Sequence, residues 1–490
     1  MAAQSFPRLA LVLLLVLQLS GCAHYLLNEP SRSFNKQKGY RFELLQAGPG
    51  NTDKLFICLA FSGGGTRAAA LAYGIMEELR KTRIKVDGLE KSLLDEVDVI
   101  SSVSGGSFTA AYYGLFRKQL FQDFKTKFLE RNIQGALVAK LFNPVNLIRV
   151  SSPWFGRIDL AAEYYNQEIF AAATFARLEE QGRPLVILNA TNLGPGRRFS
   201  FTQEYFDAIG SRLDSYPVAR AVAASSAFPF LLTPLSLENY PLASNYEPPW
   251  WYPRAETPKY WFTRRYDAAK NLDFYKDKQN AFVHLMDGGL ADNTGVRALL
   301  DAYDHGFIRK KMGLGEIKRL VFIVVNARTE AEDHISRKAS PPGIITVAEK
   351  TATIAMDNYT FESVDRLRTE LYQRVQNQKD AEALNECKRR LQEYRPEEPE
   401  AHQLKENIDF YVVEINFRAA ACIGENPRYY LDLPTSFCLS REQVEKLIAI
   451  GPKLLKASPQ FRCLLKVLQA EAEGKPRPRE CPPGSGIMGN

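Results

Sequence analysis

The chain has 490 residues, with 63 lysines and arginines against 56 aspartates and glutamates, for a formal net charge of +7. This length is enough to bury a large core, and the composition is that of a globular protein. The basic residues form no long block, which argues against a basic arm that binds nucleic acid. The small positive excess suits an anionic lipid surface at least as well. We find no internal repeat.

The first residues are typical of an export signal. A single arginine precedes the apolar run Leu9 to Leu19, which is too short for a comfortable membrane-spanning helix. The run ends in Leu19-Ser20-Gly21-Cys22, which resembles the lipobox of bacterial lipoproteins. The resemblance implies that residues 1–21 are a signal peptide and that Cys22 is lipidated. With Ala23 next, it implies an exported protein anchored in a bacterial membrane, the outer membrane facing the periplasm. The alternative is an uncleaved anchor, or a plain secretory signal with a coincidental cysteine.

Residues 22–52 are polar, contain proline and glycine, and show no sustained period. They are expected to form a tether between the membrane and a folded domain. The domain is expected to begin at residue 53. Leu55 to Phe61 is a continuous apolar run that ends in glycines, as a strand in the centre of a sheet does, and helical spacing follows from Arg67 to Arg83.

The strand-to-helix pattern recurs up to residue 330. Further strands are predicted at Val97 to Val103, Pro184 to Thr191, Val283 to Met286 and Arg319 to Asn326, and further helices at Gly105 to Leu115 and Gly295 to Tyr303. This alternation predicts an α/β domain over residues 53–330, with a mostly parallel central sheet covered by helices. In such domains functional residues collect beyond the carboxyl ends of the strands.

Two regions differ from this pattern. Residues 239–282 are an aromatic-rich insertion that contains three of the four tryptophans beside prolines and basic residues. Such rings suit a membrane interface or a mobile lid over an apolar cleft, and the alternative is a loop that packs on the body. Residues 331–490 are expected to be mainly helical and packed on the core, with one added strand at Asp409 to Phe417.

Six cysteines remain when Cys22 is set aside: Cys58, Cys387, Cys422, Cys438, Cys463 and Cys481. Cys58 lies in the middle of a predicted strand and is expected to be a small buried hydrophobe. An exported context permits disulfides among the others, but their pairing cannot be read from the sequence.

Three glycine-rich segments carry candidate chemistry. They are Ser62-Gly63-Gly64-Gly65-Thr66-Arg67, Ser102-Val103-Ser104-Gly105-Gly106 and Asp287-Gly288-Gly289. The second lies between an apolar run and a small-residue helical stretch, so Ser104 is expected on a tight strand-to-helix turn. A serine hydroxyl needs a base to become a nucleophile, and the oxyanion that forms needs fixed hydrogen-bond donors.

None of the five histidines is a good candidate for that base. They are His24, His284, His305, His334 and His402. None lies in the late loop where α/β-hydrolases carry their histidine, and His24 lies in the predicted tether. His284 is expected to face away from Asp287 as a packed core histidine. Because partial burial raises the pKa of a carboxyl, Asp287 itself is the candidate base.

With these residues the chain resembles the patatin-like phospholipases. That family carries a G-G-G-x-R loop, a G-x-S-x-G elbow and a D-G-G or D-G-A motif, in this order. The stretch Ala221 to Pro229 also resembles the family's small-residue helix with A-S-x-A-x-P. The one departure is Ser102, which stands where the elbow has its first glycine.

The resemblance implies a patatin-like three-layer α/β/α fold and a catalytic dyad without histidine. It implies the following roles: Ser104 as nucleophile and Asp287 as base; backbone amides of Gly63, Gly64 and Gly65 as the oxyanion hole, with Arg67 stabilising that loop; Ser102, Gly105 and Gly106 as the elbow; and Gly288 and Gly289 as the loop of the base. It implies no metal and no cofactor. The glycine loop matches neither the Walker nor the dinucleotide pattern, and Asp287, Asp292 and Asn293 miss the calcium-loop spacing.

The expected function is a serine acyl hydrolase of the phospholipase A or lysophospholipase type, which cleaves acyl esters of membrane lipids through an acyl-enzyme. One alternative is an acyltransferase with the same dyad. Another is a membrane-anchored lipoprotein that binds lipid or a partner without catalysis. The sequence gives neither the head group nor the oligomeric state.

Overall fold

The computed structural model describes residues 23–482, except 49, 278, 331–334, 338 and 395–407, together with residues 486–487. The predicted signal peptide, Cys22, His334 and His402 lie outside the described residues.

The continuous apolar runs form one central sheet. Its strand order is β10-β9-β1-β4-β5-β8-β7, and β6 pairs with β5 off this path. The strands are β1 (Leu55–Phe61), β4 (Val97–Val103), β5 (Leu185–Asn192), β6 (Arg197–Ser200), β7 (Leu235–Glu238), β8 (Phe282–Asp287), β9 (Arg319–Asn326) and β10 (Asp409–Asn416), beside a separate hairpin of β2 (Arg83–Val86) and β3 (Leu89–Ser92). Every residue of β1, β4 and β5 is buried, as expected of strands covered on both faces.

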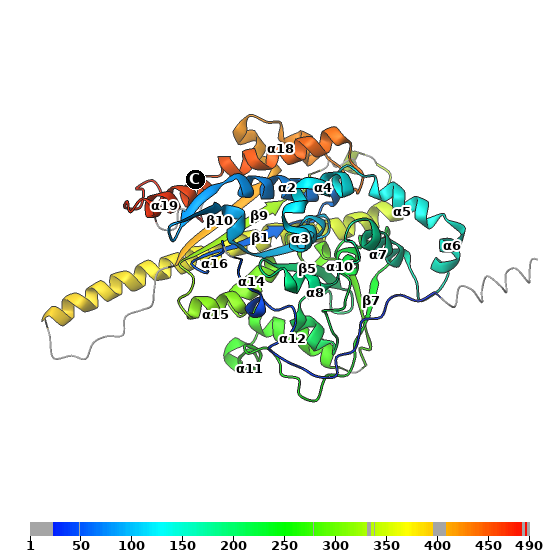
Figure 1. Cartoon of the computed structure of the whole chain (residues 1–490), viewed down its shortest axis with the longest axis horizontal. Helices are drawn as coiled ribbons and strands as arrows, with labels where there is room; N and C mark the ends of the chain where they lie inside the picture. The colour runs from blue at the N-terminus through cyan, green and yellow to red at the C-terminus, as the bar shows by residue number, and fades with distance from the viewer. Residues whose placement is uncertain are drawn as a thin grey trace, which may run out of the picture.

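Helices cover both faces of the sheet, so the fold is the predicted three-layer α/β/α arrangement (Figure 1). One face carries α2 (Gly65–Lys81), α3 (Gly105–Phe116), α18 (Arg441–Ala457) and α19 (Pro459–Ala472), and the other carries α14 (Val296–Asp304), α15 (Phe307–Gly313) and part of α16 (Ile344–Tyr394). Further α-helices are α4 (Leu120–Phe124), α5 (Ile133–Leu141), α6 (Pro144–Val150), α7 (Arg157–Glu168), α8 (Phe175–Glu180), α9 (Gln203–Ala208), α10 (Val218–Ser225), α11 (Tyr252–Ala255), α12 (Arg264–Lys276), α13 (Gly289–Asp292) and α17 (Pro427–Leu431).

The direction of β8 differs from that of the central strands. Strands β10, β9, β1, β4 and β5 run parallel, whereas β8 pairs antiparallel with β5. In the register, Val103 lies opposite Asn189, and the next residue of β5, Ala190, lies opposite Asp287. The residue after Val103 and the end of β8 are therefore level with each other, on the two sides of β5.

The N-terminal segment does not behave as the predicted tether. Asn28 is buried and its side-chain amide donates to Ser211, while the backbone amide of Val186, within the sheet, donates to the Tyr40 hydroxyl. Proline, glycine and low periodicity are typical of a loose chain. An irregular backbone can still be fixed when single side chains such as Tyr40 and Phe42 are buried, and this holds for the described part of residues 22–52.

The aromatic insertion packs on the body. Trp251 and Tyr252 are buried, and the ring of Trp251 lies 4.3 Å from that of His305. Helix α12 packs against α9 and α14, where Arg264 forms an ion pair with Asp301 at 2.8 Å. Part of residues 239–282 is thus packed on the body, whereas Trp250, Trp261 and Phe262 are exposed.

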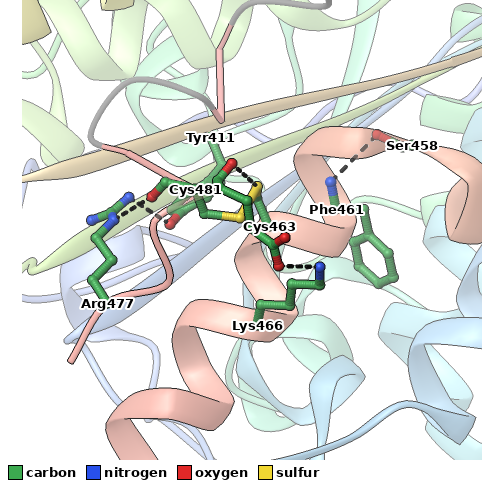
Figure 2. The surroundings of a disulfide bond; sticks show 8 residues. Tyr411, Ser458, Phe461, Cys463, Lys466, Arg477 and Cys481 are labelled. Carbon is green, nitrogen blue, oxygen red and sulfur yellow. Dashed lines mark hydrogen bonds and ion pairs between the residues drawn. A yellow bond between two sulfur atoms is a disulfide. The ribbon is translucent and has the colours of Figure 1, made fainter. Parts of the chain in front are cut away.

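The C-terminal region adds both the edge strand and a disulfide bond. Strand β10 pairs parallel with β9, close to the bounds predicted from the sequence. Figure 2 shows the disulfide between Cys463 on α19 and Cys481, beside Arg477, which forms an ion pair with Asp409 on β10. Cys58 is a buried free cysteine, as predicted, and Cys387, Cys422 and Cys438 are free and exposed. In the residues that the structure describes, no helix is both long and apolar enough to cross a bilayer.

Candidate active site

Ser104 lies on a strained turn between β4 and α3. Its φ and ψ angles are 49° and −121°, a backbone conformation that costs a non-glycine residue about 1–3 kcal/mol. The following turn packs directly on the glycine loop, because a Cβ atom on Gly105 would lie only 2.0 Å from the carbonyl oxygen of Gly65. The turn therefore holds the serine close to the glycine loop, in the geometry of a nucleophile elbow.

Buried hydroxyl groups support this turn from behind. The amide of Ser104 donates to Ser225 Oγ at 2.9 Å, and Ser225 Oγ donates to the carbonyl oxygen of Asn189 at 2.7 Å. Ser107 Oγ lies 2.9 Å from Ser225 Oγ and donates to Ser102 Oγ at 3.1 Å. The departure at Ser102 is thus accommodated, because its hydroxyl is a member of a bonded network. In the sequence Ser225 is only one residue of a motif, and nothing near it along the chain indicates its contact with Ser104.

Asp287 ends β8 with its carboxylate buried beside Ser104. The amide of Gly289 donates to Oδ1 of Asp287 at 2.8 Å. Burial raises the pKa of Asp287 to about 6, and hydrogen bonds from Gly289 and from the Ser104 side chain offset part of that rise. The backbone at this point is fixed as well, since the Asp287 amide donates to Ala227 and its carbonyl oxygen accepts a bond from Thr191.

The glycine loop leaves two of its three amides for a ligand. The amide of Gly63 donates to the carbonyl oxygen of Asn293 at 2.9 Å, so it is not available to an oxyanion. In the described structure no hydrogen bond is formed by the amides of Gly64 and Gly65, where α2 begins. Of the three amides predicted to form an oxyanion hole, that of Gly63 is therefore engaged by the protein itself.

Residues 59–300 match the family model described as patatin-like phospholipase. This region is a patatin-like phospholipase domain. The match supports a lipid acyl hydrolase as the class of activity. It covers the glycine loop, the elbow and Asp287, but it ends before β9 and β10.

Solved structures give weaker likenesses. Human GIVD cytosolic phospholipase A2 is 14% identical with a TM-score of 0.32, over 55% of this chain and 45% of that one. The structure of human GIVD cytosolic phospholipase A2 in complex with methyl gamma-linolenyl fluorophosphonate and terbium chloride is 15% identical with a TM-score of 0.29, over 55% of this chain and 40% of that one. VipD from Legionella pneumophila is 12% identical with a TM-score of 0.27, over 92% of this chain and 81% of that one. The chain thus spans less than half of the human enzyme. No curated protein sequence matches it.

The C-terminal region holds the glycine loop of the patatin-like domain in place. Arg67 is buried, and its guanidinium donates to the carbonyl oxygens of Ala327 and Leu433, at 3.0 and 2.6 Å, and to Thr435 Oγ1 at 3.1 Å. Burial lowers the pKa of Arg67 to about 9. Next to it, the Thr66 amide donates to the carbonyl oxygen of Ser436. Arg67 thus stabilises the loop from within and does not point a donor at the serine.

The described histidines have other partners than the site of the patatin-like domain. His284 is exposed and bonds Ser236 at 2.9 Å, so the expectation of a packed core histidine is wrong; β8 is near the edge of the sheet, and only alternate residues at its start are covered. His305 packs on Trp251, and His24 stacks on Trp154.

The acidic residues after Asp287 serve the fold of the patatin-like domain. Both carboxylate oxygens of Asp292 accept bonds at the start of α14: Oδ1 from the amide and hydroxyl of Thr294, and Oδ2 from the amide of Arg297. Asp292 is therefore a capping residue and not a free metal ligand. Across the described residues, no group of three or more His, Cys, Asp or Glu side chains is arranged to hold a metal ion.

Proposed function

We propose that the chain hydrolyses acyl esters of membrane phospholipids through Ser104 and Asp287. One observation carries the proposal: a serine on a strained elbow shares a buried site with a carboxylate whose pKa is raised to about 6. The carboxylate is ionised at neutral pH and is basic enough to accept the serine proton.

The reaction follows from this arrangement. Asp287 takes the hydroxyl proton as Ser104 Oγ attacks the ester carbonyl, and the amides of Gly64 and Gly65 hydrogen-bond the oxyanion. The alcohol part of the lipid leaves with a proton from Asp287, and an acyl-enzyme remains. Asp287 then takes a proton from water, which attacks the acyl-enzyme. As the bond between the acyl carbon and Ser104 Oγ breaks, Asp287 returns the proton to Ser104 Oγ and the fatty acid is released. The loss of one oxyanion donor in such sites costs about 2.7–4 kcal/mol of barrier.

Reaction with a fluorophosphonate tests the nucleophile. We expect the wild-type chain to be labelled on Ser104, the Ser104→Ala variant to be unlabelled, and Asp287→Asn to be labelled at least about a hundredfold more slowly. A folded wild-type chain without label on Ser104 contradicts the proposal. Product analysis on defined phospholipids then gives the position of cleavage, and fatty acid appearing on an added alcohol instead of in water would indicate acyl transfer.

We also propose that Cys22 is lipidated and anchors the chain in a membrane. The support is the lipobox-like sequence Leu19 to Cys22. Metabolic labelling with a fatty-acid analogue in a bacterial host tests this, with Cys22→Ser as the variant that should lose the label.

A further inference from the structure

Helices α5 and α6 form an apolar projection that the rest of the molecule does not cover. Ile133 is the buried residue of α5, and α6 has none. Phe142, Val145 and Trp154 are 68%, 65% and 51% exposed, and Val138 and Leu147 are nearly half exposed. A helix with apolar residues and no buried face normally has a partner. We refer to Val138, Phe142, Val145, Leu147 and Trp154 as the α5–α6 face.

The described chain starts beside this face. Ser152 Oγ donates to the carbonyl oxygen of Ala23 at 2.6 Å, and the amide of Tyr25 donates to the carbonyl oxygen of Trp154 at 2.7 Å. The ring of His24 stacks on Trp154 at 5.7 Å. Figure 1 shows the dark-blue N-terminal segment at the same end of the molecule as α6. Because the segment is fixed here, an acyl group on the preceding residue would emerge next to Trp154.

The start of α5 is linked by backbone hydrogen bonds to the segment that holds the glycine loop. The amide of Ile133, at the start of α5, donates to the carbonyl oxygen of Phe437 at 3.1 Å. The neighbouring residue Ser436 binds the amide of Thr66 in the glycine loop. After α6, the amide of Ile158 donates a hydrogen bond to Thr233 Oγ1. Thr233 follows the exposed Phe230 and Leu231 in the loop after α10.

The charges of the projection suit a phospholipid surface. Residues 133–150 contain no aspartate or glutamate, and their two basic residues are Lys140 and Arg149. Arg149 forms an ion pair with Glu163, whereas Lys140 has no ion-pair partner in the described structure. Tryptophan and basic side chains beside apolar residues are typical of the interface of a bilayer.

We propose that the α5–α6 face docks on a phospholipid bilayer. The inference rests on the proposed function, because the membrane that holds the lipid anchor also contains the phospholipid substrate. Phe142, Val145 and Trp154 enter the interfacial region, while Lys140 meets the head groups.

Vesicle binding tests the proposal separately from catalysis. The parent protein for this test is the chain from residue 22 onward with Cys22→Ser and Ser104→Ala. It contains all the other described residues but has neither the lipid nor the nucleophile. We expect it to sediment with vesicles of phosphatidylethanolamine and phosphatidylglycerol, and the further change Phe142→Ser with Val145→Ser to weaken binding at least about tenfold. The matched control is Phe262→Ser, at a phenylalanine that is 95% exposed elsewhere on the molecule, and it should bind like the parent. Unfolding midpoints check that all variants fold.

A second measurement locates the contact. Vesicles with brominated acyl chains should quench the tryptophan fluorescence of the parent, and the quenched component should disappear in Trp154→Phe but remain in Trp261→Phe. Equal binding by the parent and the Phe142/Val145 variant overturns the proposal, even if Ser104 is labelled normally by a fluorophosphonate. A parent that is dimeric without vesicles, and monomeric after Phe142→Ser, would assign the face to a second copy instead and would also overturn it.

Discussion

In the proposed mechanism the chemistry depends on Asp287, because burial sets the pKa of its carboxyl group. Burial raises its pKa to about 6, so the carboxylate is the main form above that pH and the neutral acid below it. The neutral acid cannot take the proton of Ser104. The activity is therefore expected to be lost as the pH falls through about 6.

The rate of fluorophosphonate labelling of Ser104 measures this pH dependence directly. We expect a plateau above pH 7 and a decline of about tenfold per pH unit below about 6. Because an ordinary histidine titrates near this value, the controls are His284→Gln and His305→Gln, in which the inflection should persist. An inflection that moves in either variant would assign the base to that histidine.

Ser225 is expected to act as a positioning residue. Ser225→Ala leaves the amide of Ser104 and the carbonyl oxygen of Asn189 without their bonds, which costs about 1–3 kcal/mol of stability. The turnover number should fall more than the affinity for a soluble ester, since the elbow shifts and the binding surface does not. Ser226→Ala is the matched control, because Ser226 Oγ bonds to the backbone of its own helix. Equal effects of both changes on kcat would contradict the positioning role.

At the scale of elements, the strands of the core could be predicted because each is a continuous apolar run between glycine or proline signals. The direction of β8 could not, since its six residues carry no mark of the strand beside which they lie. The contacts of Leu433 and Thr435 with Arg67 in the glycine loop could not be predicted either, because they join residues more than 360 positions apart. Local motifs thus indicate candidate site residues, whereas the contacts that hold these residues depend on the tertiary fold.

Arg67 connects these elements, and its replacement tests their coupling. In Arg67→Lys a single ammonium replaces a planar group that reaches three acceptors on two segments, Ala327 and Leu433 to Thr435. We expect a loss of about 3 kcal/mol in the free energy of unfolding, measured in urea, together with slower labelling of Ser104. Thr435→Val removes only one of the three bonds and should cost about 1 kcal/mol. If Arg67→Lys lowers the free energy of unfolding by no more than Thr435→Val does, the guanidinium does not stabilise the glycine loop as expected.

At the scale of the whole molecule, the fixed N-terminal segment changes what a lipid anchor would do. A loose tether of about 30 residues would let the body sample many orientations above a bilayer. In the structure, Ala23 and Tyr25 are bonded to Ser152 and Trp154, so a lipid on the residue before Ala23 is expected to be attached close to the α5–α6 face. The two contacts are then expected to act as a bivalent attachment, in which each raises the effective concentration of the other.

A double change in the lipidated chain tests this coupling. Ten glycine and serine residues inserted after Ala23 should lower the release of fatty acid from vesicle lipids only slightly, because the α5–α6 face still orients the body. Phe142→Ser alone should also have a modest effect, because the short anchor keeps the site near the bilayer. Together they should reduce release by more than the product of the single effects, since neither contact then fixes the orientation. Fatty acid release is measured at equal amounts of membrane-bound protein, and purely multiplicative effects would show that anchor and face act independently.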